Sequence, residues 1–311
     1  MSRSSGIHVG RILQVGAPAK VNLTLRILER TPDGFHRLET LFQAVDLQDS
    51  LTVSTIPGSQ MILEMPDAEL GPPEENLVTR AVRAFREATG TESGVHIRLE
   101  KRIPAGAGLG GGSSDAGATL RILNRLHGEP LSHGALQGLG ATLGADVAFF
   151  AGEAGFALGE GRGERLRPLP ALPPRTLVLG LPPVHVPTGP AYGALARLRE
   201  GSGTPRPVLA GEVPRDWPGV RALAVNDFEA VVPGAHPPIH AALQALRADE
   251  GVALALLSGS GGAVFGLPRP GEAEAVVARL REGVPGVRWL TAATLDRLPA
   301  PVEVDRGGET R

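Results

Sequence analysis

The chain has 311 residues and a formal net charge of −2, and 42% of its residues are hydrophobic against 21% charged. This length accommodates two domains, and the composition supports a buried core. The small net charge favours neither nucleic acid nor an anionic membrane as a partner, and the absence of cysteine excludes disulfides, thiolate metal sites and cysteine nucleophiles.

No targeting or membrane segment is predicted. The first residues, MSRSSGIHVGRIL, contain no apolar stretch of the length of a signal peptide. Nowhere does an apolar run reach the roughly 18 residues that a membrane span requires. We therefore expect a cytoplasmic protein without a membrane partner.

The first half of the chain combines strand and helix signals. Residues 1–10 carry no periodic pattern and are expected to be frayed. Residues 21–27 alternate between apolar and polar side chains, which predicts a half-buried strand whose polar face carries Lys20, Asn22, Thr24 and Arg26. Further strands are predicted at 38–45, 51–56, 61–64 and 95–99, and helices at 77–89, 114–126 and 133–143, with Asn76 and Ser132 as caps.

The second half of the chain has a different composition. A proline-rich stretch at 168–175 predicts a crossing between two domains. Beyond it, strands are predicted at 176–181, 252–257, 263–267 and 287–291, helices at 191–199, 239–247 and 272–282, and a long loop at 200–218. This pattern suits a layer of helices on an antiparallel sheet. We predict an α+β protein with an N-terminal domain over 10–167, a C-terminal domain over 175–298 and a disordered tail over 299–311.

The strongest chemical signal is the glycine-rich segment PAGAGLGGGSS, between a predicted strand and a predicted helix. Glycines let backbone N–H groups approach a ligand closely, and a helix start adds unpaired donors and partial positive charge. The segment is therefore predicted to hold nucleotide phosphates. Ser113 and Ser114 are expected to cap the helix or to face phosphate or Mg²⁺. A flexible loop before a capped helix is the purely structural alternative.

This segment differs from the common nucleotide-binding loops. A P-loop requires a lysine after its glycines, and a protein kinase requires later HRD and DFG motifs, which are absent. Residues 106–111 match GxGxxG, but polar residues at 100–102 precede them and the dinucleotide fold requires a second strand that is not predicted here. A dinucleotide-dependent oxidoreductase remains an alternative with weak support.

Only two of the 31 basic residues, Lys20 and Lys101, are lysine. A coding bias toward arginine explains the total but not these two exceptions. The lysine ammonium is a compact charge, whereas the arginine guanidinium is planar and binds through two parallel N–H groups. Both lysines are therefore candidates for close contact with phosphate.

Six segments of the chain carry a family resemblance. In chain order, they are PAKVNLTL (18–25), DGFH (33–36), PAGAGLGGGSS (104–114), LGADVAFF (143–150), NDFE (226–229) and SGSGG (258–262). Together they resemble the GHMP small-molecule kinases, and the resemblance covers residues 15–295. The segments DGFH, LGADVAFF and NDFE resemble, more narrowly, the branch of that superfamily that phosphorylates cytidine-diphosphate-linked methylerythritol in the non-mevalonate isoprenoid pathway.

The resemblance implies both fold and reaction. The N-terminal domain is expected to be like domain 2 of ribosomal protein S5, and the C-terminal domain to be ferredoxin-like. The implied reaction transfers the γ-phosphoryl group of ATP to the 2-hydroxyl of the cytidine-diphosphate-linked methylerythritol, with Lys20 and Asp146 as the catalytic pair. The chemistry agrees, because an attacking alcohol needs a carboxylate near its proton and a cation near the developing charge. Whether Asp146 removes the proton or positions the hydroxyl stays open.

The resemblance also implies ligand-binding residues. His36 is expected to recognise the hydrogen-bonding edge of cytosine, with Phe35, a tyrosine in most of the family, and Tyr192 beside the ring. Asn22 is expected to contact the methylerythritol or to hold Lys20. The expected nucleotide-binding residues are Lys101, Pro104, Ala105, Gly106, Ala107, Gly108, Leu109, Gly110, Gly111, Gly112, Ser113 and Ser114, and the expected substrate-binding residues are Asn22, Phe35, His36, Thr188, Tyr192, Gly259, Ser260 and Gly261.

ATP is the expected cofactor, with Mg²⁺ held by its phosphates and by water. No protein metal site is predicted, since two prolines separate His236 from His240. The expected partners are ATP and a small-molecule substrate, without nucleic acid, in a monomer or homodimer. Two further alternatives are another GHMP kinase, such as a homoserine or mevalonate kinase, which has no cytosine for DGFH to bind, and a non-catalytic nucleotide-binding protein.

Overall fold

The computed structural model describes residues 10–32, 34–66, 72, 74–201, 207, 209 and 213–305. The expected frayed N-terminus therefore lies, except for Gly10, outside the described residues, as does Asp33 of the DGFH segment. Across the described residues, no helix is long and apolar enough to cross a membrane.

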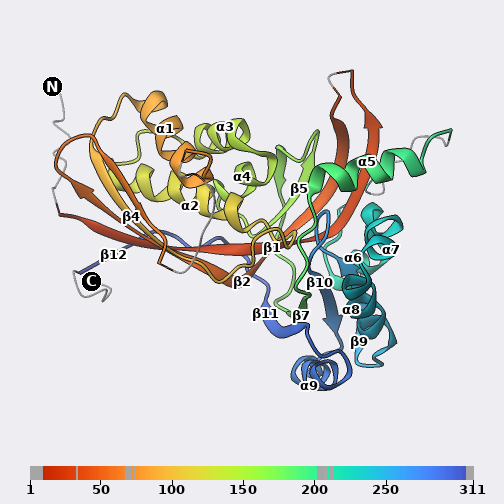
Figure 1. Cartoon of the computed structure of the whole chain (residues 1–311). Coiled ribbons are helices and arrows are strands. Elements are labelled where there is room, and N and C mark those ends of the chain that lie inside the picture. The colour runs from red at the N-terminus through yellow and green to blue at the C-terminus, as the bar shows by residue number, and fades with distance from the viewer. Residues whose placement is uncertain are drawn as a thin grey trace.

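The N-terminal part is built on one large sheet (Figure 1). Its strands follow the order β12-β1-β2-β4-β3, and β5, β6 and β8 extend it through β2, β5 and β1. Neighbours are antiparallel except for the parallel pairs β3–β4 and β1–β8. The strand bounds are β1 Ile12–Arg30, β2 His36–Ile56, β3 Met61–Glu64, β4 Gly94–Glu100, β5 Phe156–Glu160, β6 Arg165–Pro168, β8 Val225–Asn226 and β12 Val302–Val304.

Helices α1 to α4 lie together above this sheet in Figure 1. They are α1 (Leu77–Thr89), α2 (Gly111–Leu126), α3 (His133–Leu143) and α4 (Ala145–Phe150). The predicted caps of α1 and α3 are confirmed, because Asn76 accepts a hydrogen bond from the Val78 amide and Ser132 from the Ala135 amide. Leu, Ile, Val and Phe side chains of α1, α2 and the strands form one continuous core there, which the burial of apolar area stabilises.

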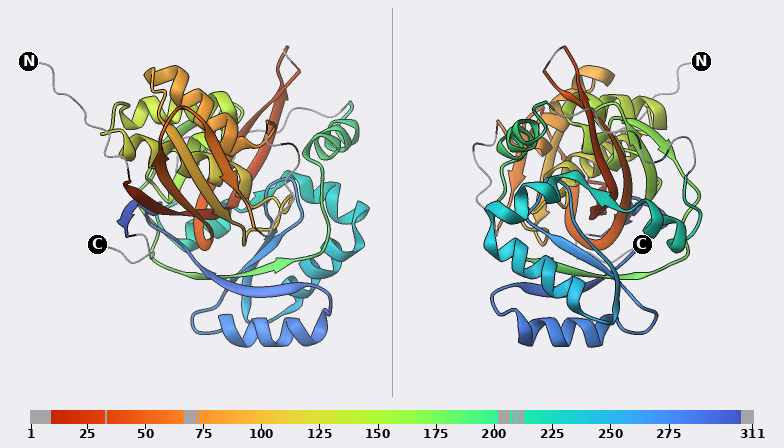
Figure 2. Two further views of the ribbon diagram at one scale, coloured as in Figure 1. Left: turned by 60° about the vertical axis from the view of Figure 1, so that its left-hand side comes forward. Right: turned by 90° about the vertical axis from the view of Figure 1, so that its right-hand side faces the viewer.

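The C-terminal part has its own antiparallel sheet of order β11-β7-β10-β9, joined to the first sheet through residues 169–175. Figure 2 shows this smaller unit, in cyan and blue, below the long red ribbons of β1 and β2. The α+β architecture predicted from the sequence is confirmed. The remaining bounds are β7 Thr176–Leu181, α5 Thr188–Leu198, α6 Trp217–Leu223, η1 Asp227–Ala230, α7 Val232–Ala235, α8 Pro237–Ala248, β9 Val252–Leu257, β10 Val264–Pro268, α9 Ala273–Gly283 and β11 Arg288–Ala293.

The prediction that residues 21–27 form a half-buried strand is wrong in one respect. Lys20, Asn22 and Thr24 on the polar face are 3%, 2% and 0% exposed, so both faces of β1 are buried at this point. Elements of both parts cover the polar face: the first turn of α4 and the glycine-rich loop lie against Lys20, and the Thr24 hydroxyl donates to the Leu223 carbonyl of the C-terminal part. Alternation predicts which side chains share a face but not what covers that face.

Three further expectations need correction. The two strands predicted at 38–45 and 51–56 are one continuous strand, β2. The tail is not wholly disordered, because Val302–Val304 forms β12 and pairs with Ile12–Gln14 of β1, while residues 306–311 lie outside the described part. Helix α6 begins at Trp217, inside the predicted loop at 200–218, of which 202–206, 208 and 210–212 are not described.

Candidate active site

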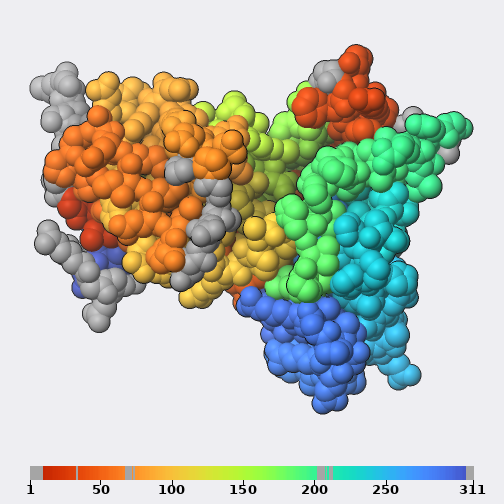
Figure 3. All heavy atoms as spheres, in the orientation of Figure 1, coloured from red at the N-terminus to blue at the C-terminus, as the bar shows by residue number. Residues whose placement is uncertain are grey.

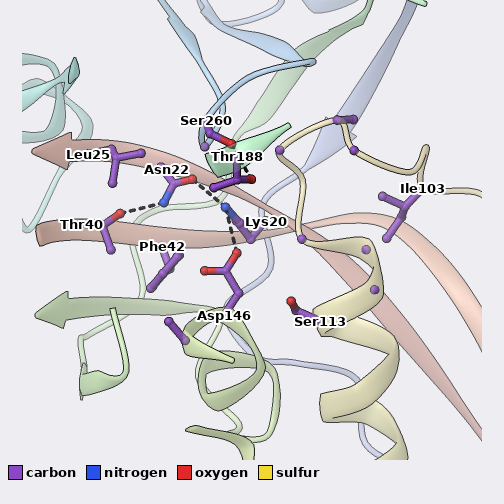
Figure 4. Close-up of a pocket in the computed structure, with 18 of the residues that line it drawn as sticks. Lys20, Asn22, Leu25, Thr40, Phe42, Ile103, Ser113, Asp146, Thr188 and Ser260 are labelled. Atoms are coloured by element: carbon purple, nitrogen blue, oxygen red, sulfur yellow. Dashed lines mark hydrogen bonds and ion pairs between the residues drawn. The ribbon is translucent and has the colours of Figure 1, made fainter. Parts of the chain in front are cut away.

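Lys20 and Asp146 lie side by side in the cavity drawn in Figure 4. The Lys20 ammonium is 3.2 Å from an Asp146 carboxylate oxygen, and the two side chains are 4% and 32% exposed. Lys20 comes from the middle of β1, and Asp146 from the first turn of α4. The cation is therefore buried in the wall, while the carboxylate faces the cavity where a ligand could reach it.

A chain of hydrogen bonds holds the Lys20 ammonium in place. Nζ donates to Asn22 Oδ1 at 2.7 Å, and Asn22 Nδ2 donates to Thr40 Oγ1 at 2.8 Å. The Thr40 hydroxyl donates in turn to the Thr24 carbonyl at 2.7 Å. All four residues lie on β1 and β2 and are buried. Because each group has a partner, the ammonium has one defined position, which Figure 4 shows directed at Asp146.

The glycine-rich segment forms the wall beside Lys20, whose backbone amide donates to the Leu109 carbonyl at 2.9 Å, and it ends at the start of α2. Gly108 has φ +74°, and a Cβ placed there would meet the Ser258 carbonyl oxygen at 2.2 Å. Gly110 has φ +73°, and its Cβ would approach Lys20 Cε at 3.1 Å. These two positions require glycine both for backbone conformation and for space. The result is a loop whose main chain lies against the cavity.

The SGSGG segment packs directly on this loop. The Ala263 amide donates to the Ala107 carbonyl at 2.7 Å, and the Ser258 hydroxyl donates to the Gly108 carbonyl at 3.0 Å. Both glycine loops therefore meet at the boundary between the N- and C-terminal parts. In Figure 3 the yellow residues around the first loop abut the green segment that leads into α5.

Helix α2 begins at Gly111, three residues before the predicted start at Ser114, and its N-cap is Gly110. The prediction that Ser113 or Ser114 caps the helix is therefore wrong, since both lie within its first turn. Ser113 lines the cavity, as Figure 4 shows, whereas Ser114 is fully buried and its hydroxyl has no hydrogen-bond partner within the described residues.

Lys101 lies at the base of the glycine-rich loop between two carboxylates. Its ammonium contacts the carboxylate of Asp49 and lies 2.5 Å from that of Asp115. The other oxygen of Asp49 accepts hydrogen bonds from the backbone amides of Arg102 and Ile103. Burial, together with the neighbouring Asp49 carboxylate, raises the pKa of Asp115 to about 7. Lys101 thus lines the cavity and also ties the loop to β2 and α2.

A second hollow of about 940 Å³ opens beside this cavity, around the DGFH hairpin and α5. His36 and Tyr192 stack there with ring centroids 5.4 Å apart. Tyr192 also packs edge to face with Phe228, and these two ring centroids are 4.9 Å apart. Burial and the nearby Asp146 carboxylate raise the pKa of Tyr192 to about 12, so its hydroxyl stays protonated. Burial, with Arg30 and Arg199, lowers the pKa of His36. A neutral imidazole offers one donor and one acceptor.

Phe35 differs from its neighbours in this hollow. It is 53% exposed, and the Arg162 guanidinium lies 3.7 Å from the centre of its ring, a cation–π arrangement. Arg162 lines both the Lys20 cavity and the second hollow, so it stands where the two meet. No motif singled out Arg162 in the sequence.

The structure brings most of the predicted site residues to one cavity of about 540 Å³. Phe35 and His36 line the adjoining hollow instead, and the side chain of Leu109 is buried in the core. Gly261 and Ser114 do not line either space. The predicted residues that line the cavity are Lys20, Asn22, Lys101, Pro104, Ala105, Gly106, Ala107, Gly108, Gly110, Gly111, Gly112, Ser113, Asp146, Thr188, Tyr192, Gly259 and Ser260.

The NDFE segment has a structural role that sequence reasoning missed. Asn226 is 3% exposed, and its amide nitrogen donates to the carbonyls of Leu257 and Gly259, which begin the SGSGG loop. Asp227 accepts hydrogen bonds from Arg26 and from the Ile27 amide on β1. The segment therefore joins β1 to the second glycine loop, and Phe228 connects it to Tyr192. The motif itself was visible, but its contacts depend on the tertiary structure.

No metal ligand set accompanies these residues. Throughout the described residues, no group of three or more His, Asp or Glu side chains is placed to hold a metal ion.

Two family models match the chain. The model "GHMP kinases N terminal domain" matches residues 76–153, which include the glycine-rich loop and Asp146, and "GHMP kinases C terminal" matches residues 210–286. Both lie in the order expected from the resemblance.

Several curated proteins named "4-diphosphocytidyl-2-C-methyl-D-erythritol kinase" are similar to the chain. The Solibacter usitatus protein is 42% identical over 264 residues, which are 81% of this chain and 80% of that protein. The Paraburkholderia phytofirmans protein is 40% identical over 293 residues, 91% of this chain and 94% of that one.

Solved structures give a consistent picture. A crystal structure of a 4-(cytidine 5'-diphospho)-2C-methyl-D-erythritol kinase superposes with a TM-score of 0.70 at 39% identity, covering 90% of this chain and 98% of the other. A homoserine kinase from Cytophaga hutchinsonii superposes with a TM-score of 0.67 at 20% identity, covering 98% and 99%, and this likeness concerns the fold alone.

Proposed function

The chain belongs to the 4-diphosphocytidyl-2-C-methyl-D-erythritol kinases within the GHMP kinases, and we propose that it transfers the γ-phosphoryl group of ATP to the 2-hydroxyl group of 4-diphosphocytidyl-2-C-methyl-D-erythritol. One observation carries the assignment of roles. The Lys20–Asp146 pair lies between the glycine-rich loop and the hollow of His36 and Tyr192. A nucleotide held on one side and a nucleobase-bearing alcohol on the other would meet at this pair.

Asp146 is the group that acts on the acceptor hydroxyl. Its carboxylate is partly exposed to the cavity and keeps at least one oxygen for a ligand, since its only ion pair among the described residues is with Lys20. A carboxylate at hydrogen-bonding distance orients the hydroxyl for in-line attack and accepts its proton as the new bond forms. Effective molarity from such positioning supplies about 7–11 kcal/mol of the barrier reduction.

Lys20 supplies the positive charge beside the transferring group. Its side chain is buried, so its field acts through a medium that screens less than water. Asn22, Thr40 and Thr24 fix the ammonium before any ligand arrives, which means that little reorganisation is needed in the transition state. This is the role in which arginine, larger and planar, is a poor substitute.

The glycine-rich loop and the start of α2 are the phosphate site of ATP. The segment Gly106–Gly112 exposes main chain to the cavity, and the N-terminal end of the sixteen-residue α2 adds free amides and partial positive charge. When bound, Mg²⁺ would neutralise phosphate charge and would be held by the nucleotide and by water. The Ser113 hydroxyl, in the first turn of α2, lines the same cavity.

His36 and Tyr192 are the cytosine site. The stacked rings provide an aromatic surface, and the neutral His36 imidazole provides the donor and the acceptor that a cytosine edge requires. Thr188 lines both spaces and Ser260 lines the Lys20 cavity, and their hydroxyls are joined at 3.0 Å, so this pair would face the linking diphosphate.

The proposal is tested by ADP release from Mg·ATP with three acceptors supplied in parallel. We expect turnover with 4-diphosphocytidyl-2-C-methyl-D-erythritol and none with homoserine or mevalonate. Turnover with homoserine or mevalonate would retain the kinase assignment but contradict the cytosine site. The absence of turnover with all three acceptors, together with tight ATP binding, would contradict the acceptor assignment altogether.

A further inference from the structure

Helix α5 lies beside the end of the β1–β2 hairpin (Figure 1), and Arg199, at the C-terminal end of the helix, joins the two. Nη1 of Arg199 donates to the Ile27 carbonyl of β1 at 2.9 Å, and Nη2 lies 2.9 Å from Oδ2 of Asp227. The same Asp227 oxygen accepts a hydrogen bond from the Ile27 amide at 2.7 Å. Arg199 therefore completes a closed set of contacts among α5, β1 and the NDFE segment.

These contacts are stronger than those of an ordinary surface ion pair. The side chain of Asp227 is 4% exposed and that of Arg199 is 25% exposed, so water screens the pair only in part. The guanidinium reaches a carboxylate and a carbonyl with two different nitrogens, which fixes its orientation. The other Asp227 oxygen accepts a hydrogen bond from Arg26, so both oxygens have partners.

Arg199 and Tyr192 lie on the same face of α5. Seven residues separate them, close to two full turns at 3.6 residues per turn. Tyr192 stacks on His36 and Arg199 donates to Ile27, and both of these partners belong to the β1–β2 hairpin. One face of the helix thus contacts the hairpin at two points, and a shift of α5 at Arg199 would also displace the Tyr192 ring from His36.

Arg199 also influences the charge of the His36 ring. Burial, with the cations Arg30 and Arg199, lowers the pKa of His36, because a nearby positive charge disfavours the protonated imidazole. Among the described residues, the titratable and charged groups on the elements around this ring are Arg26, Glu29 and Arg30 of β1, Arg37 of β2, Asp146 of α4, Arg162 and Glu164 of the turn between β5 and β6, Tyr192, Arg197 and Arg199 at α5, and Asp227 and Glu229 of η1.

We propose that Arg199 is a positioning residue for the acceptor, which sets the His36–Tyr192 stack by joining α5 to β1 and to Asp227. Its charge has a second effect, since it favours the neutral imidazole that offers both a donor and an acceptor. Arg199 acts through other residues, because the described walls of the Lys20 cavity and of the adjoining hollow do not include it. The inference rests on the proposed binding of cytosine by His36 and Tyr192.

Steady-state kinetics of two Arg199 variants test the positioning role. Arg199→Met removes the contacts and the charge, whereas Arg199→Lys keeps the charge but not the two-sided contact. We expect the KM of the acceptor to rise about tenfold in Arg199→Met and about threefold in Arg199→Lys, with kcat and the KM of ATP changed less than about twofold. Both variants should fold, because Asp227 keeps its contacts with Arg26 and the Ile27 amide.

Arg197→Met is the matched control, because it removes an exposed arginine of the same helix. The KM of the acceptor should equal that of the wild type in this variant. An equal rise in Arg197→Met and Arg199→Met would overturn the proposal. Changes of similar size in kcat and in both KM values of Arg199→Met would also overturn it, since they would assign the effect to folding.

Titration of His36 by nuclear magnetic resonance tests the effect of charge, with the resonance assigned by its loss in His36→Ala. Removal of the cation raises the pKa of His36, so in Arg199→Met the ring should become protonated at a higher pH than in the wild type. The rise in the KM of the acceptor on acidification should begin at a correspondingly higher pH. Arg199→Lys should keep the wild-type titration. Identical titration in wild type and Arg199→Met would overturn the electrostatic effect.

His36→Ala separates this inference from the proposed function. A higher KM of the acceptor in His36→Ala, without a rise in Arg199→Met, would overturn the role of Arg199 and leave the cytosine site in place. An unchanged KM of the acceptor in His36→Ala would contradict the cytosine site itself, and the inference would fail with it.

Discussion

The two ends of the site, for which we propose phosphate binding and nucleobase binding respectively, are built in opposite ways. At the phosphate end, Lys20 is 3% exposed and every group that holds it is buried, while the glycine loops present main chain. At the nucleobase end, Phe35 is 53% exposed and recognition depends on side chains of the DGFH hairpin and α5. The first end is an integral part of the core, and the second is an open surface between two parts of the chain.

This difference predicts how each end responds to change. A substitution at the phosphate end alters a network whose members have fixed partners, so it affects turnover and stability together. A substitution at the nucleobase end removes contact area that the acceptor uses and leaves the Lys20 network intact, so it affects the KM of the acceptor more than kcat. Five experiments test the contrast.

The largest effect is expected from Asp146→Asn. The amide keeps the shape of the side chain but cannot accept the proton, so kcat should fall about 10²–10⁴-fold while ATP still binds. Steady-state kinetics with a parallel measurement of nucleotide affinity provide the check. Lys20→Arg should also fail, because the planar cation does not fit the position that Asn22 and Asp146 define. Turnover near the wild-type level in either variant would remove that residue from the mechanism.

Gly108→Ala should disrupt the phosphate end by displacing the backbone. The added Cβ would meet the Ser258 carbonyl oxygen at 2.2 Å, and φ of +74° is strained for alanine. We expect a loss of about 1–3 kcal/mol in the free energy of unfolding from strain alone, and weaker ATP binding. Gly134→Ala on α3, where a Cβ meets nothing within 4 Å, is the matched control and should be neutral or stabilising. Equal ATP affinity in wild type and Gly108→Ala would contradict the close-packed loop.

Asn226→Asp tests whether the NDFE segment positions the second glycine loop. The new carboxylate would face the Leu257 and Gly259 carbonyls without a proton to donate, which costs about 1–3 kcal/mol. We expect both stability and kcat to fall. Asn124→Asp is the control. Asn124 makes two hydrogen bonds with the Leu131 backbone at a place away from Lys20 and Asp146, so only stability should fall in this variant. Identical kinetic changes in both variants would assign the effect to folding alone.

Tyr192→Leu sharpens the comparison at the open end. It removes the ring that stacks on His36, a contact worth about 0.5–1.5 kcal/mol beyond area burial. The KM for the acceptor should rise about tenfold, with little change in the KM for ATP. Kinetics with each substrate varied in turn measure the two constants. A rise confined to the KM for ATP would show that the two ends were assigned the wrong way round.

The smallest effect concerns the pH dependence of stability. The pKa of Asp115 is raised from 3.8 to about 7 in the folded protein, so folding favours its protonated form. The corresponding stabilisation is complete below about pH 4 and is lost as the pH rises through about 7, at up to about 1.4 kcal/mol per pH unit. Asp115→Asn should remove this dependence, so its stability relative to wild type should increase between pH 4 and 7. Parallel pH profiles in urea denaturation would contradict the shift.

The sequence by itself determined the reaction chemistry and most of the elements. Lys20 and the glycine-rich segment were singled out from residue type and local pattern, because phosphate binding needs backbone flexibility and a helix start that neighbouring residues encode. Asp146 was singled out only through the resemblance of its segment to the GHMP kinases. Caps such as Asn76 and Ser132 were found for the same reason, since their hydrogen bonds reach only two or three residues along the chain.

Only the tertiary structure decided what covers each surface and which distant groups become partners. Alternation in residues 21–27 predicted a half-buried strand, but α4 and the glycine-rich loop cover its polar face at Lys20, and α6 covers it at Thr24. The same holds for β12 on the edge of β1, for Asn226 on the second glycine loop and for Arg121, whose guanidinium donates to the Pro299 carbonyl. The physical reason is that burial and hydrogen-bond satisfaction depend on residues tens to hundreds of positions apart, whose approach local periodicity does not encode.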